Sequence, residues 1–126
     1  MISEELKVYK DTYLYIREAI KVFKCFPRDF KHSVGQEYLR RLLLLPSYIV
    51  RANMDTEERR YWLGEFLVDF DFCKMVIRIA GDERYISLSQ QAHLARIEGM
   101  VGRQATAWRR SAKRKSKSDH VQSTPV

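Results

Sequence analysis

Histidines and carboxylates are the side chains of this chain that could support metal or acid–base chemistry. Metal sites bridged by carboxylates in helical proteins need Glu-x-x-His pairs on facing helices. His93 is preceded at that spacing by Gln90, and His32 is preceded by Asp29, so the motif does not occur twice. The sequence therefore predicts no metal site and no cofactor.

Arginine and histidine together could instead cleave RNA. Small helical ribonucleases share this size and charge, and carry an Arg-x(4–6)-His motif. Arg28 and His32 enclose only three residues, and His93 has no arginine at the required interval. A triad that converges only in space is not excluded by sequence, but no nucleophile elbow or glycine-rich loop accompanies the histidines. We therefore expect a binding protein without catalytic residues.

Arginine spacing is the feature that does suggest a function. A guanidinium group donates two parallel hydrogen bonds and so suits phosphate. On a helix, residues seven apart share one face at intervals of about 10 Å, which predicts backbone-directed, salt-dependent nucleic-acid binding. The candidate residues are Arg96, Arg103 and Arg110, then Arg40, Arg41, Arg51, Arg59 and Arg60, and finally Arg109, Lys113, Arg114, Lys115 and Lys117.

Positive charge is concentrated near the C-terminus. The net charge is +7, and residues 109–126 hold six basic side chains against one acidic side chain, so they account for +5 of it. A nearly neutral body with a basic extension favours a polyanionic partner, nucleic acid before acidic membrane. A tail that serves only solubility is the alternative.

Composition favours one helical domain. The chain has 126 residues, of which 45% are hydrophobic, and only 5 Gly and 3 Pro. Cys25 and Cys73 lack CxxC spacing and are expected to be buried free thiols. There is no signal-peptide core and no apolar run of about 18 residues. These features predict a cytoplasmic protein with no membrane partner.

Four stretches with apolar residues three and four apart are expected to form helices. The first ends before Pro27, the second runs from about His32 to Ala52, the third begins at Asp55 or Thr56, and Ser87 begins the fourth with a capping box. Gly81 is expected to close the third helix in the left-handed conformation. The expected stripes are Leu6, Tyr9, Tyr13, Ile16, Ile20 and Phe23; Leu63, Phe66, Phe70, Cys73, Ile77 and Ala80; and Leu94, Ile97, Val101, Ala105 and Trp108.

The second and third helices have apolar residues on more than one face. Residues 42–45 are four consecutive leucines and cover most of the helix circumference, so part of this surface is expected to contact another subunit. Pro46 should kink the second helix or, less simply, divide it. The predicted interface residues are Leu42, Leu44, Leu45, Val68 and Phe72.

Helices of about 20 residues with short connections predict an all-α, antiparallel, up-and-down four-helix bundle over residues 1–111. Residues 112–126 are rich in Lys, Arg and Ser, which predicts a disordered basic tail.

Several short motifs are similar to those of one known family. Phe-Pro-Arg at 26–28 with Gly-Gln at 35–36, the segment IRIAGDERYIS at 77–87, and Val-Gly-Arg at 101–103 followed by Trp108 resemble the accessory variability determinant (Avd) proteins of diversity-generating retroelements. The resemblance covers about residues 5–110. A sister family, encoded in intervening sequences of bacterial large-rRNA genes, is similar at Leu-Pro-Ser-Tyr-Ile, residues 45–49, but has asparagine where this chain has Tyr48. The late tryptophan and the Gly-Arg pair favour the Avd group.

The resemblance implies a non-enzymatic partner of a reverse transcriptase. Such a protein would form a homo-oligomer, a pentamer in that family, bind the reverse transcriptase together with template RNA or cDNA, and support mutagenic retrohoming. Arg103 matches the motif arginine of the family. The alternatives are an intervening-sequence-type bundle of obscure role, a small RNA-cleaving enzyme, and a helical interaction module without nucleic acid.

Overall fold

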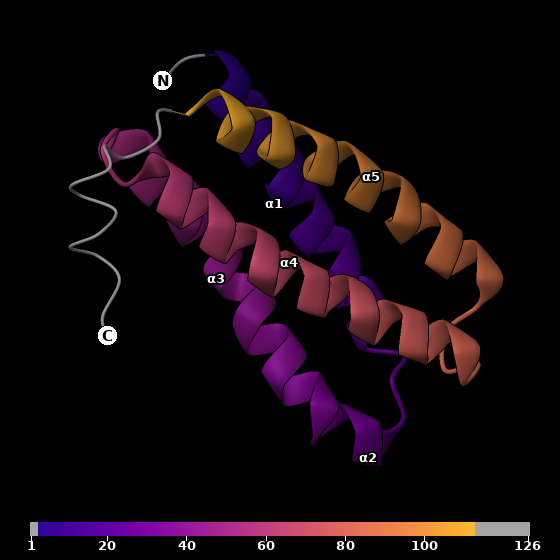
Figure 1. The fold of residues 1–126 in the computed structure, drawn as a ribbon. Coiled ribbons are helices and arrows are strands. Elements are labelled where there is room, and N and C mark those ends of the chain that lie inside the picture. Colours follow the sequence, from indigo (N-terminus) through magenta and orange to yellow (C-terminus); the bar gives the residue numbers. More distant parts are fainter. Residues whose placement is uncertain (1–2, 113–126) are drawn as a thin grey trace.

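The computed structural model describes residues 3–112, and the regular elements of this part of the chain are all helices, as predicted. Each long helix packs against two others, α1 and α4 both lying against α3 and α5, so that the four enclose one core (Figure 1). Within these residues no helix combines the length and apolar composition of a membrane span. The tail residues Lys113, Arg114, Lys115 and Lys117 lie outside the described part. The helices are α1 (Ser3–Phe23), α2 (Arg28–Lys31), α3 (Val34–Met54), α4 (Arg59–Asp82) and α5 (Leu88–Ser111).

The apolar stripes predicted for α4 and α5 form the centre of the core. Phe70 is fully buried, stacks on Phe66 at 5.6 Å between ring centroids, and meets the edge of the Tyr15 ring at 5.4 Å. Cys73 is buried as expected, but Cys25 is exposed. All predicted stripe residues of these two helices are buried, namely Leu63, Phe66, Phe70, Cys73, Ile77 and Ala80 on α4, and Leu94, Ile97, Val101, Ala105 and Trp108 on α5.

The stripe predicted for α1 is wrong in its first half. Leu6, Tyr9 and Tyr13 are exposed, and Tyr13 keeps 57% of its surface in contact with solvent. The helix carries apolar residues on two neighbouring faces, so three–four spacing alone fits either one. The face that packs on the partner helices includes Tyr15, whose hydroxyl donates to Glu98 of α5 at 2.8 Å. The buried face consists of Val8, Thr12, Tyr15, Ile16, Ala19 and Val22.

The connection between α1 and α3 contains a short helix, α2, that the apolar patterns did not predict. Pro27 precedes α2 in an extended conformation, in line with its fixed φ and missing N–H. Phe26 is buried, with ring centroids 5.0 Å from Phe30 and 5.9 Å from Tyr38. A Cβ on Gly35 would come within 3.1 Å of the Phe30 carbonyl oxygen. An aromatic cluster therefore closes this end of the core, and glycine lets the chain pass beside it.

The α4–α5 turn confirms one predicted cap and corrects another. The Ser87 side chain accepts from the Gln90 N–H at 3.0 Å and Gln90 reciprocates at 2.8 Å, which is the predicted capping box. Gly81 lies inside α4 rather than beyond its end, and Arg84 takes the left-handed conformation with φ of 63°. The Gln91 amide fills the space that a Cβ on Gly81 would need. The Gln91 side chain therefore packs against Gly81, and the left-handed residue of this turn is an arginine.

The start of α4 was predicted too early. This helix begins at Arg59, and Asp55 instead accepts the Glu58 N–H at 3.1 Å within the connection. Arg59 donates to the Ala52 carbonyl at 2.8 Å and so satisfies the end of α3, which runs on to Met54. The predicted cap residue Asp55 thus bonds within the connection, four residues before the helix begins.

The leucine run on α3 is divided between the core and the surface. Helix α3 continues through Pro46 without interruption, so the reading as two short helices is wrong. Leu42 and Leu45 are fully buried within this chain. Their assignment to a subunit interface is therefore wrong, because no part of either side chain is available to a second copy. Leu43 is the outward member of the run, with 53% of its surface exposed.

Candidate nucleic-acid interface

Two of the predicted arginines on α3 are held by one carboxylate. Arg40 donates to both Glu37 oxygens at 2.8 and 2.9 Å, and Arg41 donates to the same group at 2.8 Å. Hydrogen bonds from Arg40 and then Arg41 lower the pKa of Glu37 to about 2. These guanidinium groups are partly neutralised before any phosphate arrives.

Aromatic rings of α4 cover two arginines of α3. The Arg41 guanidinium lies 4.1 Å from the Phe72 ring centroid and 3.6 Å from Asp69. Arg51 lies 4.8 Å from the centroid of Trp62. Contacts of this kind contribute roughly 0.5–1 kcal/mol each at exposed sites. They hold α3 against α4, which gives both arginines a structural use.

Three more of the predicted arginines tie helix ends together. Arg59 lies 5.5 Å from the Trp108 ring centroid while it donates to the end of α3. Arg60 donates to the Arg109 carbonyl and Arg109 donates to the Arg60 carbonyl, both at 3.2 Å. The Arg109 guanidinium lies over Gly64, where a Cβ would be 3.3 Å from its Nε atom. The start of α4 is thereby joined to the end of α5.

The seven-residue series on α5 has no such partners. Arg96, Arg103 and Arg110 are all exposed, on the side of α5 away from its buried stripe. None of the three forms an ion pair, hydrogen bond or ring contact with another residue of the described range. Of the predicted residues within that range, these three have guanidinium groups with no internal partner.

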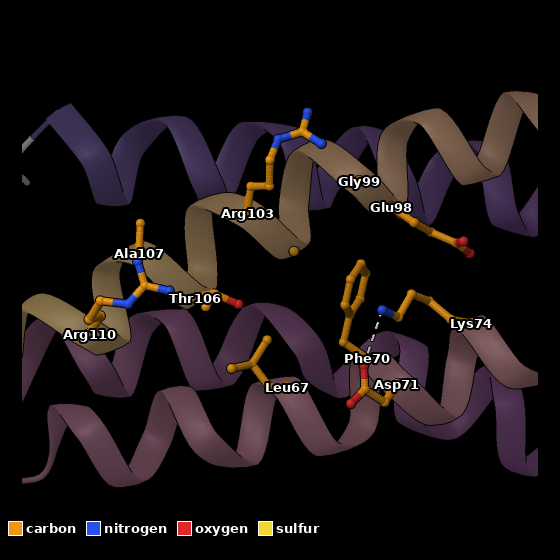
Figure 2. A pocket seen from close by; sticks show the side chains of 11 residues that line it. Leu67, Phe70, Asp71, Lys74, Glu98, Gly99, Arg103, Thr106, Ala107 and Arg110 are labelled. Atoms are coloured by element: carbon orange, nitrogen blue, oxygen red, sulfur yellow. Dashed lines mark ion pairs between the residues drawn. The ribbon is translucent and has the colours of Figure 1, made fainter.

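A groove between α4 and α5 runs beside this series. Its larger part has a volume of about 630 Å³ and continues into a second hollow of about 550 Å³ that shares Asp71, Lys74 and Glu98. Figure 2 shows Leu67, Phe70 and Lys74 projecting from α4 toward α5. The α5 wall of the larger hollow is formed by Glu98, Gly99, Gly102, Arg103, Thr106, Ala107 and Arg110.

Sequence reasoning missed this groove. Its lining includes Gly99 and Gly102 inside a helix, where glycine is unfavourable by about 1 kcal/mol relative to alanine, and that cost was the available signal. A Cβ on Gly99 would lie 3.2 Å from Nη1 of Arg103, so the arginine side chain rests over this glycine. A Cβ on Gly102 would lie 3.6 Å from the Phe70 ring.

Glu98 is an acidic group in this basic setting. The Tyr15 hydroxyl donates to its Oε2 atom at 2.8 Å. Burial raises the pKa of Glu98, while the Tyr15 hydrogen bond and then Lys74 act in the opposite direction. On the opposite wall, Asp71 pairs with Lys74 at 3.2 Å. The groove therefore carries acids near its middle and unpaired arginines toward the end of α5.

The histidine and carboxylate groups are arranged as surface pairs. His93 lies 2.8 Å from Glu18, which also accepts from Lys21 at 2.8 Å. Hydrogen bonds from Lys21 and His93 lower the pKa of Glu18. Among the described residues no three His, Cys, Asp or Glu side chains are grouped as metal ligands.

Comparison with known families identifies the chain. A family model described as bAvd-like matches residues 7–112, which span nearly the whole described structure, including the α5 arginine series. Neither the curated proteins nor the solved structures contain a significant match. The chain therefore belongs to the bAvd-like family of accessory proteins.

Proposed function

We propose that the protein is a non-enzymatic nucleic-acid-binding accessory protein of a diversity-generating retroelement. It assembles as a homo-oligomer, binds the reverse transcriptase, and holds template RNA or cDNA beside it during mutagenic retrohoming. Family membership supports the retroelement role. The observation that carries the nucleic-acid part is the set of three exposed, unpartnered guanidinium groups on α5.

The scaffold that we propose for this role is an up-and-down antiparallel bundle. Helix α4 has 24 residues and so is about 36 Å long at 1.5 Å per residue. Residues 55–58 separate it from α3, and four residues span at most about 14 Å. A connection this short returns the chain along the preceding helix, which supports antiparallel neighbours.

Two unlike apolar faces support the homo-oligomer. Arg41 and Tyr48 of α3 reach Phe72 and Asp69 of α4. Leu43 follows Arg41 by two residues, about 200° around the helix, so it points away from α4. On α4, Val68 is 60% exposed. Unlike faces on different sides of one subunit favour head-to-tail contacts, which close into rings.

Salt-dependent binding tests the nucleic-acid part of the proposal. Fluorescence anisotropy with labelled RNA and DNA, titrated from about 50 to 200 mM salt, should give log Kobs that falls linearly with log[salt]. A full-length protein that binds neither polymer at the lowest salt would overturn the proposal. Labelled RNA should also remain intact after prolonged incubation, whereas cleavage would point to an enzyme.

Complementation between two variants tests the assembly. Leu43→Glu and Val68→Glu each place a charge on one face, and each variant alone should be monomeric by mass photometry or sedimentation. Mixed together, they should form a one-to-one complex through their two intact faces. Leu88→Glu, at a residue that is 83% exposed, is the matched control and should assemble like the parent chain. A parent chain that is monomeric contradicts the assembly.

A further inference from the structure

The groove between α4 and α5 has two features that a nucleic-acid strand requires, and the first is unpaired positive charge at its edge. Arg103 and Arg110 both line the larger hollow, whereas Arg96 lines neither hollow. The two side chains are seven residues apart, or about 10 Å along α5. Phosphates that follow this edge would meet one guanidinium group after another.

The second feature is an apolar floor that is open to the edge. Leu67, which is partly exposed, forms the α4 side of the floor, and the buried Phe70 ring lies beside it (Figure 2). Gly102 on the α5 side of the hollow adds no side chain to it. Grooves that bind single strands commonly combine cationic contacts to the backbone with apolar or aromatic surfaces for the bases. A strand here can place phosphates at the arginines and a base against Leu67 and the backbone of Gly102, both of which are partly exposed.

Acidic residues limit where this strand can lie. Glu98 and Asp71 stand at the junction of the two hollows, and both repel phosphate when ionised. The half of the groove between Gly102 and Arg110 contains no carboxylate. The accessible segment is therefore the half that leads toward the end of α5.

We propose that this half of the α4–α5 groove binds single-stranded nucleic acid, with phosphates on Arg103 and Arg110 and an unpaired base in the hollow over Gly102. The inference rests on the proposed nucleic-acid function and adds the form of the ligand. A duplex keeps its bases stacked inside and can reach only the outer arginines. The groove thus confers a preference for unpaired template or cDNA.

Filling the hollow without changing its charge tests the proposal. In Gly102→Met the Cβ meets Phe70 at an ordinary contact distance, and the longer side chain occupies the groove. Thr106→Met, at an exposed position of the same wall, is a second variant that places no new atoms in the core. Ala92→Met is the control, because Ala92 is exposed on α5 and lines neither hollow.

The probe is an RNA of about 12 nucleotides, within the usual range of single-strand site sizes, used alone and annealed to its complement. The parent chain should bind the single strand more tightly. Each groove variant should weaken single-strand binding about tenfold, as expected for one lost base contact, and leave duplex binding unchanged. Equal effects on both probes, or none on the single strand, overturn the groove proposal while nucleic-acid binding stands. Absence of binding to either probe overturns the proposed function itself.

Discussion

The three arginines of the seven-residue series on α5 and the arginines of the α3–α4 pair have the same chemistry and opposite uses. Arg41 and Arg59 contact acceptors or rings of neighbouring helices. Arg96 and Arg103 on α5 face solvent, without an internal partner in the described range. A guanidinium group that already donates its hydrogen bonds has fewer left for phosphate. The number of arginines therefore overstates the binding surface, and their partners define it.

Removing the unpartnered set should have the largest effect. The variant Arg96→Gln/Arg103→Gln/Arg110→Gln loses three phosphate contacts. The slope of log Kobs against log[salt] (the salt slope) for a single strand should therefore become less steep by about 2, which corresponds to binding about 100-fold weaker near 0.1 M salt. The free energy of unfolding should stay within about 0.5 kcal/mol of the parent value. Anisotropy titrations and urea unfolding measure the two quantities.

A charge-matched variant separates position from net charge. Arg17→Gln/Arg28→Gln/Arg84→Gln also removes three positive charges, all from exposed residues outside the α5 series. Its salt slope should match that of the parent chain. Equal losses in the two triple variants would mean that binding follows net charge alone, and the distinction between the two arginine groups would fail.

Removing a partnered arginine should lower the stability of the protein and leave its nucleic-acid binding unchanged. Arg59→Met leaves the Ala52 carbonyl without its 2.8 Å donor at the end of α3. Loss of a hydrogen bond from a charged donor should lower the free energy of unfolding by about 1.5–3 kcal/mol, measured in urea. The salt slope of nucleic-acid binding should not change. Arg110→Met is the reference, and a similar loss of stability there would contradict the comparison.

Glu98 and Glu37 have pKa values that are shifted in opposite directions, so their variants should depend on pH in opposite ways. Because burial raises the pKa of Glu98, its contribution to stability is present below its unfolded pKa and is lost as pH rises through the folded value. Glu98→Gln should therefore be more stable than the parent chain at neutral pH and equal to it in acid, by urea unfolding across pH. It should also bind nucleic acid severalfold more tightly, since a repelling charge has gone.

Glu37 should show the reverse dependence. Its pKa is lowered to about 2 by Arg40 and Arg41, so its contribution is present above the unfolded pKa and is lost as pH falls toward 2. Glu37→Gln should be less stable than the parent chain at neutral pH. A change of the same sign in both variants would contradict the assigned environments.

The smallest effect is expected at an arginine that belongs to neither group. Arg84 has φ of 63° in the α4–α5 turn, a conformation that strains residues with a Cβ. Arg84→Gly should raise the free energy of unfolding by about 0.5–1 kcal/mol, after allowing for the greater entropy of glycine in the unfolded chain. Thermal or urea unfolding measures this, and nucleic-acid binding should be unchanged. A decrease in stability would mean that the Arg84 side chain makes a stabilising contact.

Sequence patterns predicted the elements that depend on neighbours along the chain. The buried stripe of α5 and the Ser87 capping box were predicted correctly, because helical periodicity and a three-residue cap are local. The start of α4 was not, since residues 55–58 form a connection in which Asp55 accepts the Glu58 N–H, and Arg59 bonds back to the end of α3. The α1 stripe failed for a related reason, as two apolar faces compete and only the partner helices choose between them.

The sequence by itself determined the helical class, the capping signals and the regular spacing of arginines on α5, since all of these follow from the 3.6-residue repeat. Tertiary structure alone decided which arginines remain unpartnered, that Leu42 and Leu45 belong to the core, and that Gly102 lines a groove beside Phe70. Each of these depends on atoms that are brought together from different helices. The spacing of residues within one helix does not specify contacts between helices. The candidate site depends on such contacts.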